Sequence, residues 1–124
     1  MTEYINDEIT DVGFGAFIYY DSLKQVNFPN CTSIGSSAFY NCTALTTVDF
    51  PVCTVIGSYA FYSCKSLTTI NFPACSKIFN NAFYNCTALT SVDFPMCTEI
   101  KNSAFQYCTS LTTINFPVCT TINS

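Results

Sequence analysis

The sequence predicts a parallel β-solenoid, in which the chain coils repeatedly and stacks one short strand on the next. Three observations support this prediction. The stretch at residues 38–53, AFYNCTALTTVDFPVC, returns every 22 residues with small changes. Before each Phe-Pro pair, residues alternate between apolar and polar, which is the period of a β-strand. A single copy cannot bury its own apolar face, so the copies must stack to form a core.

The repeats divide the chain into units of one domain, residues 1–124. Residues 1–15 form a partial N-terminal repeat, in which ITDVG at 9–13 aligns with CTSIG at 31–35. Units of 22 residues then begin at 16, 38, 60, 82 and 104, and the last is one residue short. The chain stops in mid-repeat without a capping pattern. We therefore expect either a piece of a longer array or an open apolar end that pairs with a second copy.

The strand of each unit is the segment before Phe-Pro. In LTTVDF at 45–50, Val48 and Phe50 share one face, while Thr47 and Asp49 share the other. Pro51 ends the strand because it has no N–H for the ladder. Proline in every unit also excludes an eleven-residue coiled coil. The Ala-Phe-x-x-Cys segment that opens each unit is too short for more than one or two helical turns.

Aligned copies place identical apolar residues in columns, which stacking turns into ladders. The columns are leucine at 23, 45, 67, 89 and 111; Val or Ile at 26, 48, 70, 92 and 114; phenylalanine at 28, 50, 72, 94 and 116; and isoleucine at 34, 56, 78, 100 and 122. Ten of the twelve phenylalanines lie in two columns. The aromatic content therefore indicates packing in the core rather than a cofactor site.

The composition excludes several classes of function. Hydrophobic residues make up 49% and charged residues 10%, so a large core is expected and disorder is not. With a net charge of −4, no arginine and no basic stripe, nucleic acid is not expected as a partner. No apolar run has the ~20 residues of a membrane span. Histidine is absent, and no acid/base pair, nucleophile–base set or phosphate loop occurs, so we expect no enzyme activity and no cofactor.

Nine cysteines occur at eleven-residue intervals, as two interleaved columns. One follows each strand, and the other precedes each leucine: Cys31, Cys53, Cys75, Cys97 and Cys119, then Cys42, Cys64, Cys86 and Cys108. Stacked Cα atoms ~4.8 Å apart would permit disulfides, but parallel Cβ atoms are too far apart and nine is odd. Zinc-type spacing and a base for a catalytic thiol are both missing. We expect buried, reduced thiols that act as small apolar residues, and no metal site.

Outward residues of the strands form two polar columns, which are the candidate binding site. They are Gln25, Thr47, Thr69, Ser91 and Thr113, and Asn27, Asp49, Asn71, Asp93 and Asn115. The alternative is that these are simply solvated strand residues. A third column, Tyr40, Tyr62 and Tyr84, lies near the Ala-Phe corner. It could stack on sugars or protein partners, although packing over the turn is the alternative.

The pattern LxxVxFPxCxxIGxxAFxxCxxL resembles the BspA-like (treponemal) class of leucine-rich repeats, over about residues 9–124. The resemblance implies a right-handed leucine-rich-repeat solenoid, with a parallel β-sheet on the concave face and short turns or 3-10 segments on the convex face. The two polar columns would then line the concave face. One departure is that the glycine of the Ile-Gly pair, present at Gly35 and Gly57, becomes Phe79 and Lys101. This argues against a strict need for positive φ at that turn.

The resemblance also implies a role. It indicates a non-enzymatic module that binds a protein or a surface glycan, of the cell-surface or adhesion type. The alternative is an intracellular or phage-structural assembly module that associates end to end with further copies. MTEYINDEIT at 1–10 is not a signal peptide, so the compartment stays open between cell surface or secreted, which the family implies, and cytoplasmic.

Overall fold

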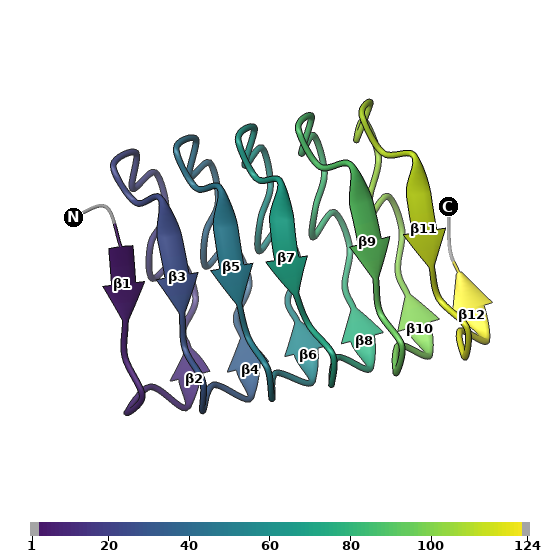
Figure 1. Cartoon of the computed structure of the whole chain (residues 1–124), viewed down its shortest axis with the longest axis horizontal. Helices are drawn as coiled ribbons and strands as arrows, with labels where there is room; N and C mark the ends of the chain where they lie inside the picture. Colours follow the sequence, from purple (N-terminus) through teal and green to yellow (C-terminus); the bar gives the residue numbers. More distant parts are fainter. Residues whose placement is uncertain (1–2, 123–124) are drawn as a thin grey trace.

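The computed structural model describes residues 3–122, which form six stacked coils with two short strands in each (Figure 1). The first strands of the coils are β1 (Glu3–Ile5), β3 (Gln25–Asn27), β5 (Thr47–Asp49), β7 (Thr69–Asn71), β9 (Ser91–Asp93) and β11 (Thr113–Asn115). The second strands are β2 (Asp11–Val12), β4 (Ser33–Ile34), β6 (Val55–Ile56), β8 (Lys77–Ile78), β10 (Glu99–Ile100) and β12 (Thr121–Ile122). The predicted parallel β-solenoid is confirmed, and residues 3–122 contain no helix.

The first strands make the predicted parallel ladder, which we call the front face. Each residue pairs with the residue 22 positions later, as in Thr47 with Thr69 and Val48 with Ile70. Asp11 pairs with Ser33 and Val12 with Ile34, again at an offset of 22 residues. The strands are only three residues long, shorter than the predicted segment. The front ladder consists of a four-stranded sheet, β1-β3-β5-β7, and a separate pair, β9 and β11.

The second strands form a continuous six-stranded sheet that the sequence analysis missed. Their order is β2-β4-β6-β8-β10-β12, and all neighbours are parallel. The expectation of short turns or 3-10 segments away from the front face was therefore incomplete. Turns do follow β2, β4, β6, β8 and β10, but their i→i+3 hydrogen bonds are interrupted by residues with positive φ, so no 3-10 helix forms in residues 3–122.

Two positions in each of these turns have positive φ. They are Gly15, Ser37, Tyr59, Asn81 and Ser103, and four residues later Tyr19, Asn41, Ser63, Asn85 and Tyr107. The Ile-Gly glycines lie outside both sets, so the doubt about positive φ there is confirmed. Glycine at position 57 is explained by lack of space instead, because an added Cβ would lie 2.7 Å from the carbonyl carbon of Gly35. The coils approach too closely at that point for a side chain.

Two ladders of phenylalanine rings fill the core. In the Ala-Phe column the rings stack at a constant centroid distance of 5.1 Å, from Phe17 to Phe105, with interplanar angles of 3–6°. The Phe-Pro column packs against it edge to face, for example Phe50 on Phe39 at 6.1 Å. Each buried ring contributes about 1.5–3 kcal/mol through burial and about 0.5–1.5 kcal/mol more through aromatic geometry. These ladders set the spacing of the coils.

All nine cysteines are free thiols, and seven are buried; Cys108 and Cys119 are half-buried. The thiols after each strand donate to the carbonyl oxygen two residues later, as Cys53 does to Val55 at 3.3 Å. The others donate to a phenylalanine carbonyl of the preceding coil, as Cys64 does to Phe39 at 3.2 Å. Burial raises the pKa of both Cys42 and Cys53 to about 12. The prediction of buried thiols is confirmed for seven of the nine, and the hydrogen bonds that their S–H groups donate were not predicted.

Candidate binding face

All ten predicted site residues lie on the front face, in the two predicted columns. The ladder places Gln25, Thr47 and Thr69 side by side, and Asn27, Asp49 and Asn71 beside them. In the second sheet of this face Ser91 pairs with Thr113 and Asp93 with Asn115. Seven of the ten side chains are exposed, and Asn27, Thr47 and Asp49 are half-buried. Alternation along each strand explains the arrangement, because the intervening Val or Ile points into the core.

Hydrogen bonds tie the Asn/Asp column into pairs. The Nδ2 of Asn71 donates to Oδ1 of Asp49 at 2.7 Å, and the Nδ2 of Asn115 donates to Oδ1 of Asp93 at 3.0 Å. The alternation of Asn and Asp has an electrostatic reason. Two carboxylates on adjacent strands would repel each other, whereas an amide between them supplies a donor. Each Asp therefore has one carboxylate oxygen held in place by the amide of the next strand.

The two polar columns of the front face carry a net negative charge. The ladder extends the first column to Glu3, which pairs with Gln25 in β3. With Asp49 and Asp93 this gives three carboxylates and no lysine in the two columns. Such a surface attracts basic groups over a distance of about 8–10 Å at physiological salt. It offers hydroxyl, amide and carboxylate groups for hydrogen bonding.

The acidic and thiol side chains of the described residues do not cluster. Across residues 3–122 no group of three or more His, Cys, Asp or Glu side chains could hold a metal ion. Neither does this stretch contain a helix long and apolar enough to cross a membrane. The ion pairs, Lys101 with Glu99 at 2.8 Å and Lys77 with Glu99 at 3.9 Å, lie at the back sheet.

The tyrosine column is larger than the sequence analysis found. Tyr40, Tyr62 and Tyr84 stack face to face at 4.7 and 4.9 Å. Tyr19 and Tyr107 close the two ends of this stack edge to face, at 5.7 and 5.2 Å. Since the ring faces cover one another, only edges and hydroxyl groups reach the solvent along the stack. The packing interpretation of this column is favoured over stacking on sugars.

Comparison with known proteins identifies the repeat. Residues 5–124 match the family model described as the BspA type leucine rich repeat region, in six copies. The chain belongs to the BspA-type leucine-rich repeat family. The six matched copies agree with the six coils of the structure. No curated protein is significantly similar in sequence to this chain.

Solved structures of leucine-rich repeat proteins are similar to this chain in sequence and fold. A leucine-rich repeat protein from Bacteroides ovatus is 33% identical with a TM-score of 0.92, and the match covers 100% of this chain and 33% of that protein. A T. pallidum leucine rich repeat protein is 28% identical with a TM-score of 0.77, covering 81% and 51%. A protein of Faecalibacterium prausnitzii described as a leucine rich cell surface protein is 28% identical with a TM-score of 0.65, covering 92% and 38%. The chain thus spans a third to a half of each.

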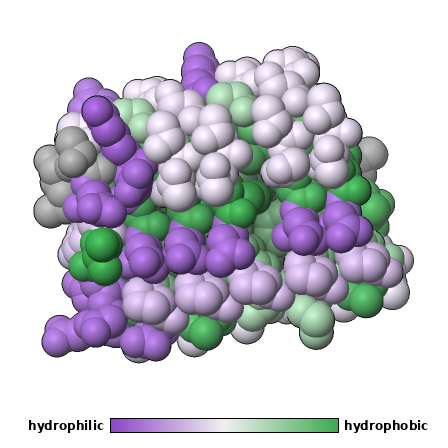
Figure 2. Space-filling view, viewed as in Figure 1, coloured by the Kyte–Doolittle hydropathy of each residue, from purple (hydrophilic) through white to green (hydrophobic). Residues whose placement is uncertain are grey.

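Figure 2 shows the front face of this BspA-type solenoid and one feature that the sequence analysis missed. The row of hydrophilic side chains along the strands is interrupted between β7 and β9, where a hydrophobic hollow opens. The ten site residues therefore form two blocks and not one flat plate. The columns at 69–71 and 91–93 keep the repeat pattern apart from Ser91 in place of threonine, and that change alone does not predict this break.

Proposed function

We propose that this chain is a non-enzymatic binding module whose front face contacts a protein or a surface glycan, in an adhesion role at a cell surface. One observation supports it most. Ten polar side chains project in two registered columns from a rigid sheet, and within the columns only the two Asn–Asp pairs are bonded to one another. Rigid, outward polar groups lose little conformational entropy on binding, which is how repeat surfaces gain affinity.

The test is a binding screen on glycan and protein arrays with two matched variants. The front variant changes Thr47, Asp49, Thr69 and Asn71 together to alanine. The control variant changes Lys77, Asn80, Lys101 and Asn102 on the back side to alanine. Loss of a bound ligand in the front variant alone, with both variants folded by circular dichroism, supports the proposal. Equal binding by all three proteins would refute it.

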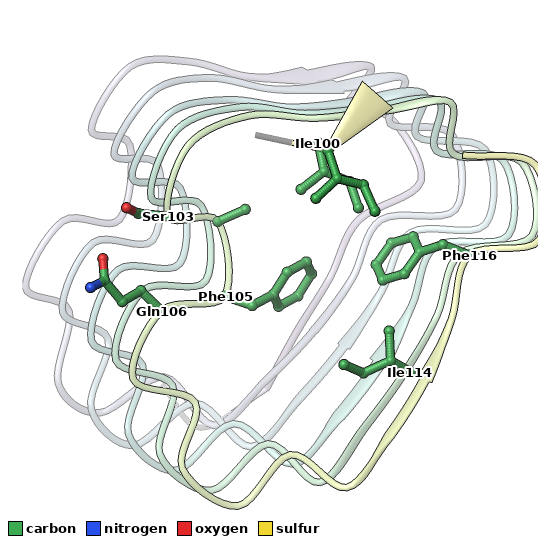
Figure 3. Close-up of a pocket in the computed structure, with 8 residues that line it drawn as sticks. Ile100, Ser103, Phe105, Gln106, Ile114 and Phe116 are labelled. Atoms are coloured by element: carbon green, nitrogen blue, oxygen red, sulfur yellow. The ribbon is translucent and has the colours of Figure 1, made fainter. Parts of the chain in front are cut away.

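A second candidate is assembly through the ends of the solenoid. The last coil leaves an open hollow of about 620 Å³ lined by apolar side chains including Phe105, Ile114, Phe116 and Ile122 (Figure 3). Ile114 is 62% and Ile122 67% exposed, and β11 and β12 are sheet edges. Such edges pair readily with further strands. A following coil or a second copy of this chain would satisfy them.

The register defines how a second copy would fit. Its β1 would continue the ladder from β11, placing Tyr4 beside Ile114, and its β2 would place Val12 beside Ile122. This contact is head to tail and does not close, so it would produce open filaments. Sedimentation velocity over a dilution series tests it, with Ile114→Lys as the disrupting variant and Val118→Lys as the control. A monomer at all concentrations would contradict assembly.

A further inference from the structure

The front sheet parts between β7 and β9, although the back sheet is continuous there. β7 is the last strand of one front sheet and β9 the first of the next, while β6, β8 and β10 pair without a break behind them. Figure 1 shows the wider spacing between β7 and β9 than between the other front strands. The opening is therefore a local slit in one face and not a break between domains.

Hydrogen bonds that recur at other junctions are missing at this one. The amides of Phe28, Phe50 and Phe94 donate to the carbonyl oxygens of the next coil at 3.0–3.2 Å. In residues 3–122, no corresponding bond joins the Phe72 amide to Asp93. The hydroxyls of Thr46, Thr68 and Thr112 donate to the coil before, whereas that of Thr90 does not reach the Thr68 carbonyl. The β7 wall of the slit thus has an unpaired Phe72 N–H group at one end of the strand and an unpaired Thr68 carbonyl at the other.

The core confirms that the opening is confined to the front. Phe72 and Phe94 are 5.9 Å apart, compared with 5.3 Å for Phe50 and Phe72 and 5.4 Å for Phe94 and Phe116. In the Ala-Phe column the same coils keep the 5.1 Å spacing. The coils are therefore fixed at that corner and spread only at the strands.

The floor of the slit is apolar and its rim is polar. Ile70 is partly exposed, whereas Val48 and Val92, its neighbours in the same column, are fully buried. Figure 2 shows the hydrophobic floor between the two blocks of hydrophilic side chains. By the register, the rim is formed by Thr69 and Asn71 on one side and Ser91 and Asp93 on the other.

We propose that this slit is a docking site for a protein partner, which inserts one apolar side chain onto Ile70 and carries a basic side chain beside it. The inference rests on the proposed binding role of the front face and specifies the partner. An apolar side chain covers the exposed part of Ile70, which sugar hydroxyls would not. The peptide backbone next to it offers an acceptor for the Phe72 amide and a donor for the Thr68 carbonyl. The carboxylates of the front face favour a neighbouring lysine or arginine.

The slit itself is tested without any partner, by amide hydrogen exchange followed by NMR. The Phe72 amide should exchange at least about tenfold faster than those of Phe50 and Phe94, since a lost hydrogen bond removes protection of this order. Equal protection of the three amides would show that the front sheet is closed and would overturn the inference. That result would leave the proposed function of the front face intact.

The partner is tested by titrating the protein with three synthetic peptides, Ac-Lys-Phe-Lys-NH₂, Ac-Lys-Ser-Lys-NH₂ and Ac-Glu-Phe-Glu-NH₂. The first should perturb the amide signals of residues 69–72 and 91–93 and bind at least about fivefold more tightly than the other two. Ile70→Thr should weaken it at least about fivefold, whereas Val52→Thr, at an exposed apolar residue outside the two polar columns, should not. Three results would each overturn the inference. They are equal binding of the three peptides, no effect of Ile70→Thr on the affinity of the first peptide, and perturbation of the same amide signals by a chito-oligosaccharide. A glycan-array ligand lost in the front variant, together with a silent peptide titration, would retain the proposed function while rejecting this partner.

Discussion

The close approach of successive coils at Gly57 should make Gly57→Ala destabilising. The added Cβ would lie 2.7 Å from the carbonyl carbon of Gly35 and 2.8 Å from both the Ile34 oxygen and the Ser36 nitrogen. All three are backbone atoms, so no side chain can rotate away. Ordinary contacts begin at 3.4 Å, so one coil must move by about 0.7 Å relative to the other.

The size of the effect follows from what that movement disturbs. The Gly57 amide donates to the Ile34 carbonyl at 2.8 Å, and a shift of this size would take it beyond good hydrogen-bond geometry. In the next coil Phe79 occupies the equivalent position, and its amide still donates a hydrogen bond to the Ile56 carbonyl at 3.0 Å. Because the fold can yield there, the cost should be that of moderate overpacking. We expect a loss of about 1–3 kcal/mol in the free energy of unfolding.

Gly13→Ala is the matched control, because nothing lies within 4 Å of its Cβ position. It should leave the free energy of unfolding unchanged or raise it by up to about 1 kcal/mol, through the lower entropy of the unfolded chain. Urea denaturation followed by circular dichroism measures both variants, provided that the transitions are two-state. Equal stability of the two variants would show that contact between coils at Gly57 does not limit the fold.

Three further predictions follow from the ladders. First, buried thiols hold their protons more tightly in the folded state, so the free energy of unfolding should be constant below about pH 8 and fall between pH 9 and 12, by up to about 1.4 kcal/mol per thiol and pH unit. Urea midpoints at pH 7.5 and 10.5 measure this fall, and Cys53→Ala should reduce it. An unchanged midpoint would contradict the prediction. Second, Asn71→Asp should lower the free energy of unfolding by about 1–2 kcal/mol in urea denaturation, because it replaces a 2.7 Å hydrogen bond with repulsion between two carboxylates; 1 M NaCl should restore part of this loss. Asp49→Asn should cost less than about 0.5 kcal/mol, and equal costs for the two variants would refute the electrostatic account. Third, Ser37→Gly should raise the thermal midpoint, with a gain of about 0.5–1 kcal/mol, by removing the strain of φ 58°; a lower midpoint would show that the Ser37 side chain is needed.

Most of the fold could be predicted because each column of the sequence becomes one ladder. Alternation in LTTVDF assigned Val48 to the core and Asp49 to the front face, and both assignments are confirmed. The same logic placed all ten site residues in register. The sequence also showed that Gly35 and Gly57 need not have positive φ, because Phe79 and Lys101 replace the glycine in later units.

The features that sequence analysis missed have no periodic signal of their own. The back strands are two residues long, as in Val55–Ile56, which is too short for alternation to be visible. Positive φ falls on Tyr59 and Tyr107 as well as on asparagine, because the stacked turn imposes it regardless of residue type. The slit at Ile70 depends on how far two coils spread, and the repeat pattern is the same at the closed junctions.

The slit can open because the coils are held together more firmly at the Ala-Phe corner than at the front face. At the Ala-Phe corner each coil is held to the previous one by stacked rings, whose centroids are 5.1 Å apart, and by thiol-to-carbonyl hydrogen bonds such as that from Cys86 to Phe61. At the front face, polar residues and solvent impose no comparable constraint, so the strands there can separate without disturbing the corner. A repeat of this kind therefore keeps its architecture in buried columns and leaves its exposed columns free to differ. This division of roles is why the front face can open between β7 and β9 while the Ala-Phe ring ladder at the corner stays regular.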